Sequence, residues 1–150
     1  MSVFGGSATS RLFLNVREKQ SLCYYCASRF ASPTAFMMVD SGVEPANAEK
    51  AEQAILKELE NLVNGPITEE ELENSRRGLL SGMTSVGDSL AGLENWYYNE
   101  ILRGGVINTP EQAASQLMQV SAEDVRSILA GFQYSVGYLV TKKEEPSHAE

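Results

Sequence analysis

Histidine and cysteine, the side chains that most often hold transition metals, are scarce in this sequence. The 150 residues include one histidine, His148, and two cysteines, Cys23 and Cys26. A protein zinc site takes about three or four such ligands, with water completing the shell in open sites. One histidine next to the C-terminus and one cysteine pair do not make such a set, so we predict that this chain holds no metal.

The sequence also lacks long apolar runs and an excess of basic residues. No apolar stretch approaches the ~18 residues of a membrane-spanning helix, and Met1–Gly6 lacks the basic and then apolar pattern of a signal peptide. Lysine and arginine total 12 against 20 acidic residues, for a net charge of -8. Nucleic-acid binding needs a basic surface. We therefore expect a cytoplasmic protein with neither nucleic acid nor membrane as a partner.

The two cysteines have the Cys-x-x-Cys spacing that is found in redox and metal sites. A redox pair normally lies at a helix N-terminus, where the dipole lowers the thiol pKa. The stretch Leu22–Cys26 is instead rich in aromatic residues, which favours a strand. Residues three apart in a strand point to opposite faces. We predict two partly buried thiols that neither bridge nor share a ligand.

The first third of the chain has the pattern of a helix followed by a β-hairpin. Apolar residues at helical spacing predict a helix over about Ser7–Lys19. Two strand-like runs follow, roughly Ser21–Phe30 and Ala35–Val43, and Ser32–Thr34 separates them as a hairpin connection would.

The remainder is predicted to be mainly helical. A helix is expected from Asn47 to Asn64, and the capping box Thr68–Glu71 begins a much longer helical pattern that Gly104–Gly105 ends. Glycines weaken this pattern, and Gly87–Ser89 is the expected break. Three more elements follow: helices from Thr109 to about Met118 and from Ser121 to about Gly131, and a strand over Tyr134–Thr141.

This order of elements predicts an α+β fold. Strands joined by a hairpin form an antiparallel sheet, and helices gathered in one block pack on one of its faces. Residues 1–141 are expected to form one module. The charged tail, 142–150, is expected to be disordered.

Three segments resemble, in the right order, a known peptidase family. Arg11–Tyr25 begins with Arg-Leu-Phe, continues with Arg-Glu-Lys and ends with Leu22-Cys23-Tyr24-Tyr25. This resembles the signature of the insulinase-like (pitrilysin-like, M16) metallopeptidases, Arg-Leu-Phe and then Arg-Glu-Lys-x-Gly-Leu-Ala-Tyr. Gly42–Asn47 and Gly65–Leu72 resemble the family's strand exit and its entry to a long helix. Ser21 and Cys23 depart from the family's glycine and small residue.

The resemblance implies a half-module of a two-module protein. In this family the first module carries zinc on an inverted His-x-x-Glu-His helix, a motif that this sequence does not contain. The chain resembles the C-terminal, non-zinc-binding module, including inactive forms, and is expected to be truncated at its N-terminus. The implied zinc belongs to an absent or partner module. The implied partners are an N-terminal zinc-binding module or an active peptidase subunit, and a peptide substrate. Alone, the chain is expected not to cleave peptides and to be prone to self-association.

The resemblance also carries over two site residues. In active members an arginine and, seven positions later, a tyrosine reach the zinc site of the opposite module, and here these are Arg17 and Tyr24. A guanidinium can bind substrate carbonyls or a carboxylate, and a tyrosine hydroxyl can donate to an oxyanion. Two functions remain open: the substrate-side half of a zinc metallopeptidase, and a catalytically inactive scaffold or partner subunit of a peptidase-like heterodimer.

Overall fold

The computed structural model describes residues 1–31 and 34–141. The predicted tail, 142–150, lies outside the described residues. Three elements precede the helical block: the short helix α1 (Ser2–Gly5), the π-helix η1 (Leu12–Lys19) and the hairpin of β1 (Tyr25–Ala31) and β2 (Phe36–Gly42). The helical elements that follow are η3 (Pro45–Asn47), α2 (Ala48–Asn64), α3 (Glu69–Thr84), η4 (Ser85–Asp88), α4 (Leu90–Arg103), α5 (Pro110–Leu117) and α6 (Ala122–Ala130).

The sheet in the described residues is a two-stranded antiparallel hairpin. Its register runs from Tyr25 opposite Gly42 to Ala31 opposite Phe36. The predicted pairing is confirmed, although the connecting Ser32 and Pro33 lie outside the described residues. The predicted first helix begins later than expected, at Leu12, because Gly6 and the residues after it form a turn.

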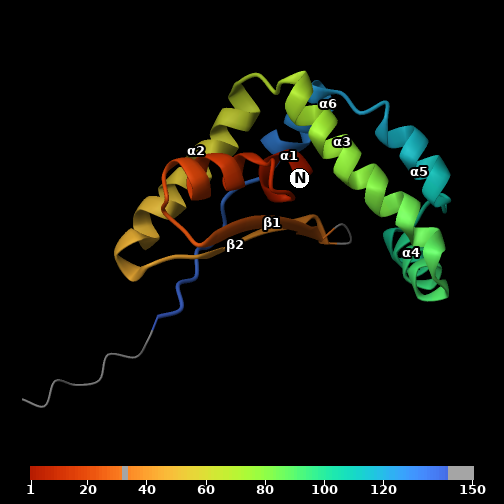
Figure 1. Cartoon of the computed structure of the whole chain (residues 1–150), viewed down its shortest axis with the longest axis horizontal. Helices are drawn as coiled ribbons and strands as arrows, with labels where there is room; N and C mark the ends of the chain where they lie inside the picture. Colours follow the sequence, from red (N-terminus) through yellow and green to blue (C-terminus); the bar gives the residue numbers. More distant parts are fainter. Residues whose placement is uncertain (32–33, 142–150) are drawn as a thin grey trace, which may run out of the picture.

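One face of the hairpin is covered. Along β1, Cys26 and Ser28 are buried whereas Tyr25 and Arg29 are exposed, which is the alternation of a half-buried strand. The helices α1 and η1 pack directly on β1, and α2 packs on η1 and α6 (Figure 1). The predicted α+β class is confirmed. The helices that cover this face of the hairpin include α1 and η1, which precede it, as well as helices of the block after Pro45.

The core gathers residues from distant parts of the chain. Helix α1 supplies Phe4, and η1 supplies Leu12 and Val16, all fully buried. Leu62 of α2 and Leu129 of α6 belong to the same cluster. The core therefore lies between the hairpin, which contributes Cys26, and the helices α1, η1, α2 and α6.

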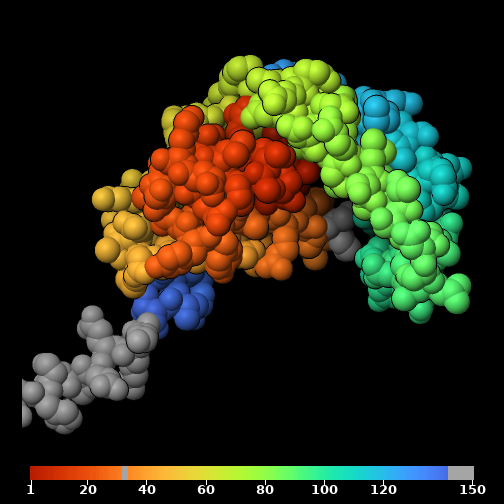
Figure 2. Space-filling view, in the orientation of Figure 1, coloured from red at the N-terminus to blue at the C-terminus, as the bar shows by residue number. Residues whose placement is uncertain are grey.

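The long helical pattern is broken where the sequence predicted. Helix α3 ends at Thr84, η4 covers Ser85–Asp88, and the Ser89 side chain accepts a hydrogen bond from the Gly92 backbone N–H to start α4. Figures 1 and 2 show α3 and α4 as an arm that extends away from the hairpin, with α5 against it. None of the helices in the described part combines the length and apolarity needed to cross a membrane.

The predicted strand over Tyr134–Thr141 is wrong. These residues have no regular secondary structure, and the Tyr134 hydroxyl donates to Glu52 of α2. A strand forms only when its backbone pairs with a neighbour, and within the described residues this segment pairs with neither β1 nor β2. Tyr134, Val136, Tyr138 and Val140 alternate as residues of a strand do. This pattern favours a strand, but in the described residues no other strand pairs with the segment.

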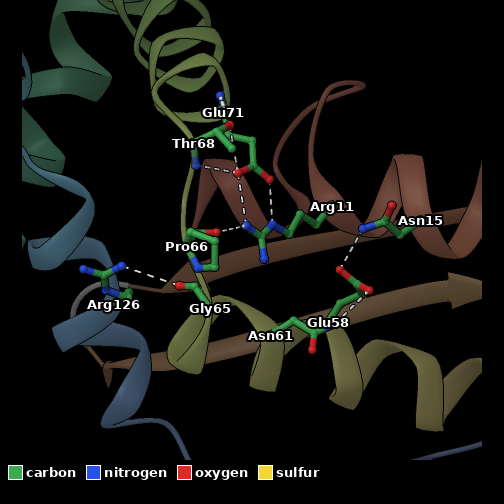
Figure 3. Close-up of polar contacts among 9 residues, drawn as sticks. All are labelled: Arg11, Asn15, Glu58, Asn61, Gly65, Pro66, Thr68, Glu71 and Arg126. Atoms are coloured by element: carbon green, nitrogen blue, oxygen red, sulfur yellow. Dashed lines mark hydrogen bonds and ion pairs between the residues drawn. The ribbon is translucent and has the colours of Figure 1, made fainter.

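An ion pair fixes the first turn of α3 to η1 (Figure 3). Arg11 Nε lies 2.6 Å from Glu71 Oε1, Arg11 Nη2 lies 3.0 Å from Glu71 Oε2, and Nη2 also donates to the Pro66 carbonyl at 2.6 Å. The side chains are only 13% and 24% exposed. Glu71 simultaneously completes the capping box with Thr68. The pair therefore joins residues 60 positions apart at the point where α3 begins.

We expect Arg11→Met to destabilise the chain by about 2 kcal/mol at about pH 7, because it leaves a partly buried carboxylate without its main partner. Hydrogen bonds from Arg11 lower the pKa of Glu71 below its ordinary value of 4.5. A carboxyl whose pKa is lowered on folding stabilises the fold above its unfolded pKa, and this contribution is lost as the pH falls through the folded pKa. The difference in unfolding free energy between wild type and Arg11→Met should therefore be largest at neutral pH. It should decrease as the pH falls below 4.5, the ordinary pKa of glutamate.

Urea denaturation at several pH values measures this gap. The matched control is Lys57→Met, which removes an exposed pair with Glu60 and should cost at most about 0.5 kcal/mol. If the stability difference between wild type and Arg11→Met stays constant down to acid pH, the ion pair with Glu71 does not stabilise the fold as proposed.

Candidate functional site

Arg17 and Tyr24, seven residues apart in the sequence, are in direct contact. Arg17 lies in the last turn of η1, and its Nε donates to the Tyr24 backbone carbonyl at 2.8 Å. The guanidinium carbon lies 4.6 Å from the centre of the Phe13 ring, one turn earlier, and Nη1 donates to Glu18 at 2.9 Å. In the described residues Nη2 makes no hydrogen bond. The guanidinium is thus held in place with one amino group left to bind a ligand.

Tyr24 immediately precedes β1, and its side chain is 66% exposed. Its hydroxyl donates a hydrogen bond to the Glu44 carboxylate at the exit of β2. This hydrogen bond, together with the negative charge of Glu44, raises the pKa of Tyr24 above its ordinary value of 10. The phenol is therefore a protonated donor at neutral pH. The Tyr24 hydroxyl must break its hydrogen bond with Glu44 before it can donate to the oxyanion of a substrate.

The sequence did not single out Glu44 as a partner of Tyr24. The hairpin register contains the signal that would have found it. Because Tyr25 pairs with Gly42, the residues just before β1 lie beside those just after β2, which places Glu44 within reach of Tyr24.

Both predicted site residues line one cavity of about 490 Å³. Neither side chain is buried in the core, and both belong to the same surface. The cavity extends from Arg17 and Tyr24 along β1. Its lining is completed by Gly5, Gly6, Ser7, Phe13, Tyr25, Cys26, Ala27, Ser28 and Arg29.

The turn between η1 and β1 has an unusual backbone at Ser21, with φ of 51°. This is the left-handed region, which glycine enters freely and which costs other residues roughly 1 kcal/mol. Ser21 occupies the position where the peptidase signature has glycine. Ser21 therefore adopts this conformation at some cost in strain, and the turn brings Tyr24 back to Arg17.

The cysteines are both free, with Cys26 buried in β1 and Cys23 half-buried before it. The prediction of two partly buried thiols is confirmed. The prediction of opposite strand faces is wrong, because β1 begins at Tyr25 and strand alternation does not reach Cys23. Burial, with a smaller contribution from nearby Cys23, raises the pKa of the Cys26 thiol to about 12. Cys26 is therefore a poor nucleophile and metal ligand.

The described part of this chain does not bring together the side chains that a zinc site requires. Residues 1–31 and 34–141 contain no group of three histidine, cysteine, aspartate or glutamate side chains that could hold a metal ion. His148 lies outside those residues. That the chain holds no metal stays a prediction.

Several known proteins are similar to this chain. The family description "Peptidase M16 inactive domain" matches residues 1–79, more than half of the chain. A Bacillus subtilis protein named probable inactive metalloprotease YmfF is 30% identical over 97% of this chain. A second B. subtilis protein, named uncharacterized zinc protease YmxG, is 28% identical over 85%. The chain spans 34% and 32% of the length of these relatives.

Solved structures share the fold. A conserved protein from Enterococcus faecalis superposes with a TM-score of 0.78 at 31% identity, covering 86% of this chain and 30% of that one. A protease from Helicobacter pylori superposes with a TM-score of 0.73 at 17% identity, covering 86% of this chain and 32% of that one. The arrangement of η1, hairpin and helical block is therefore one that larger proteins contain.

Proposed function

The chain belongs to the peptidase M16 family, in which it matches the inactive domain, and from this membership we propose that it is the substrate-facing, non-zinc-binding half of a zinc metallopeptidase that acts on peptides. The observation that carries the proposal is the joint position of Arg17 and Tyr24. Both line one cavity, both are accessible, and each is fixed by contacts within this chain.

The two residues would have different roles. The free Nη2 group of Arg17 would bind a carbonyl or carboxylate of the substrate, in a position that the Phe13 ring and Glu18 hold constant. The Tyr24 hydroxyl would leave Glu44 and donate to the oxyanion that forms when the peptide carbonyl is attacked. A zinc ion in the partner module would supply the activated water. This chain would contribute binding and charge stabilisation only.

The second candidate is a catalytically inactive scaffold or partner subunit. Two observations favour it: a relative matched over nearly the whole chain is named probable inactive metalloprotease, and the Tyr24 hydroxyl is engaged by Glu44 rather than free. In this case the cavity would form part of the interface with an active subunit. For either function, the cytoplasm remains the proposed location.

Substituting Arg17 distinguishes the two candidates. In the full-length or assembled zinc-containing enzyme, Arg17→Ala should raise KM about 10–100-fold with little change in kcat, since it removes a charge-assisted hydrogen bond made in the ground state and the transition state alike. Steady-state kinetics on a fluorogenic peptide measures this. Arg17→Lys should recover part of the loss because it keeps the charge without the planar fork.

Arg103→Ala is the matched control. Arg103 ends α4, where it pairs with Glu100 outside the cavity, so its removal should leave KM unchanged. If Arg17→Ala has normal kinetics in an active enzyme, the substrate-side proposal is wrong. The scaffold or partner subunit is then the remaining candidate.

A further inference from the structure

The two free thiols lie against each other in the folded chain. Cys26 is the second residue of β1 and is 5% exposed, and Cys23, which precedes the strand, is half-buried. The chain bends at Tyr24, between them, and the Cys26 thiol contacts the side chains of Cys23 and Ser41. The expectation of separated thiols rested on opposite strand faces, which this geometry does not have.

A bend between the two residues is what a disulfide at this spacing requires. Three residues of an extended strand cover about 10 Å, whereas disulfide-linked Cα atoms are usually about 4.4–6.8 Å apart. Regular strand geometry begins only at Tyr25, and the bend at Tyr24 shortens the distance that a bridge must span. The bridge would close a small loop that contains both tyrosines.

The two thiols differ in the way that thiol–disulfide exchange requires. In this reaction an accessible thiolate attacks a disulfide, and a second thiol then attacks the mixed disulfide that forms. Cys23 is the more exposed of the pair. Burial raises the pKa of the Cys26 thiol to about 12, which keeps it protonated and unreactive toward reagents in solution. Cys23 is therefore the thiol that reacts first, and Cys26 lies beside it to complete the exchange.

We propose that Cys23 and Cys26 are a redox-modification site, which forms an intramolecular disulfide by exchange with a small-molecule disulfide. The Cys23 thiolate attacks one sulfur of the reagent and releases the other half as a thiolate, which takes up from water the proton that Cys23 gave up. The Cys26 sulfur then attacks the Cys23 sulfur, and the second half leaves with the Cys26 proton. Two protein thiols are oxidised, and the reagent is reduced to two thiols.

Closing this loop acts on the candidate site. The Tyr24 N–H donates to the Gly42 carbonyl at 2.7 Å, and the Tyr24 carbonyl accepts from Arg17 Nε at 2.8 Å. A bridge between Cys23 and Cys26 tightens the bend at Tyr24 and strains these two hydrogen bonds. This part of the inference rests on the proposed function: the bridged protein no longer holds Tyr24 in place beside Arg17, so its turnover falls.

The test treats the reduced full-length protein with oxidised glutathione, blocks the remaining thiols by alkylation and digests the protein with trypsin. Both cysteines then lie in one peptide, 20–29, which Lys19 and Arg29 delimit. We expect mass spectrometry to show this peptide unalkylated and lighter by two hydrogens than its reduced form, and a phosphine reductant to reverse the change. Cys26→Ser should stop at a glutathione adduct on Cys23. Cys23→Ser should react at least about tenfold more slowly, because its remaining thiol is buried.

Three results would overturn the inference. The first is a wild-type peptide that carries two alkyl groups after treatment, and the second is a wild type that stops at a stable glutathione adduct. Equal reaction rates for Cys23→Ser and wild type are the third, because Cys26 would then react first. The wild-type measurement needs no variant, so it decides whether the bridge forms even if a substitution disturbs folding.

Activity tests the link to Tyr24. In the assembled zinc-containing enzyme, the bridged form should have a kcat at least about tenfold below that of the reduced form. The phosphine should restore kcat, and Cys23→Ser should keep its kcat under the same treatment. An unchanged kcat in fully bridged wild type, with kcat lowered by Tyr24→Phe, would refute this link. A normal kcat for Tyr24→Phe would instead reject the proposed function, and the peptide mass would still decide whether the bridge forms.

Discussion

Replacing Tyr24 with phenylalanine is expected to lower kcat about 10²–10³-fold in the assembled zinc-containing enzyme, with little change in KM. The substitution removes a single hydroxyl and keeps the ring. Tyr24 is exposed and lines the cavity, and its hydroxyl, whose hydrogen bond to Glu44 raises its pKa above the ordinary value of 10, is protonated at neutral pH. A donor that engages only the developing oxyanion stabilises the transition state and not the bound substrate, so its loss appears in kcat.

Single-turnover and steady-state kinetics on the same peptide measure this effect. Tyr98→Phe is the control, because Tyr98 is an exposed tyrosine on α4 and does not line the cavity. Its kinetics should equal those of the wild type. Should Tyr24→Phe turn over peptide at the normal rate, Tyr24 has no part in catalysis. The scaffold candidate would then account better for its hydrogen bond to Glu44.

Truncating Phe4 should have the largest effect on stability. We expect Phe4→Ala to lower the free energy of unfolding by about 3–5 kcal/mol, because it leaves a cavity in a well-packed core. Phe4 is fully buried, and its cluster joins η1, α2 and α6. A loss of this size is a large part of the total stability of a typical domain.

Chemical denaturation followed by circular dichroism measures this loss. Phe36→Ala, the same substitution at an exposed position of β2, should cost less than about 1 kcal/mol. Similar losses for the two variants would mean that the region around Phe4 can collapse to fill the gap, and that the core is less tightly packed than its burial indicates.

Local features of the fold were predictable from the sequence. The hairpin follows from two apolar runs with a turn between them, and the break between α3 and α4 follows from Gly87 and from the capping tendency of Ser89. The starts of α3, α5 and α6 each follow from a capping box that the structure contains. In each case the residues that decide the structure lie within a few positions of one another.

Features that depend on distant residues were not predictable in the same way. Whether Tyr134–Thr141 becomes a strand depends on a neighbouring strand, which no local pattern reveals. The ion pair of Arg11 with Glu71 and the hydrogen bond of Tyr24 with Glu44 join residues 60 and 20 positions apart. The resemblance pointed to Arg17 and Tyr24, but the hydrogen bond from Arg17 Nε to the Tyr24 carbonyl came only from the structure.

The composition of the core has a consequence for synthesis on the ribosome. Chains emerge from the N-terminus onwards, and the capping boxes allow the later helices to start as soon as they leave the exit tunnel. Val3, Phe4 and Leu12 are translated before the rest of this segment, yet their cluster is completed by Leu129. These apolar side chains must therefore wait for the last helix of the described chain, and they stay without full cover for nearly the whole translation of this segment.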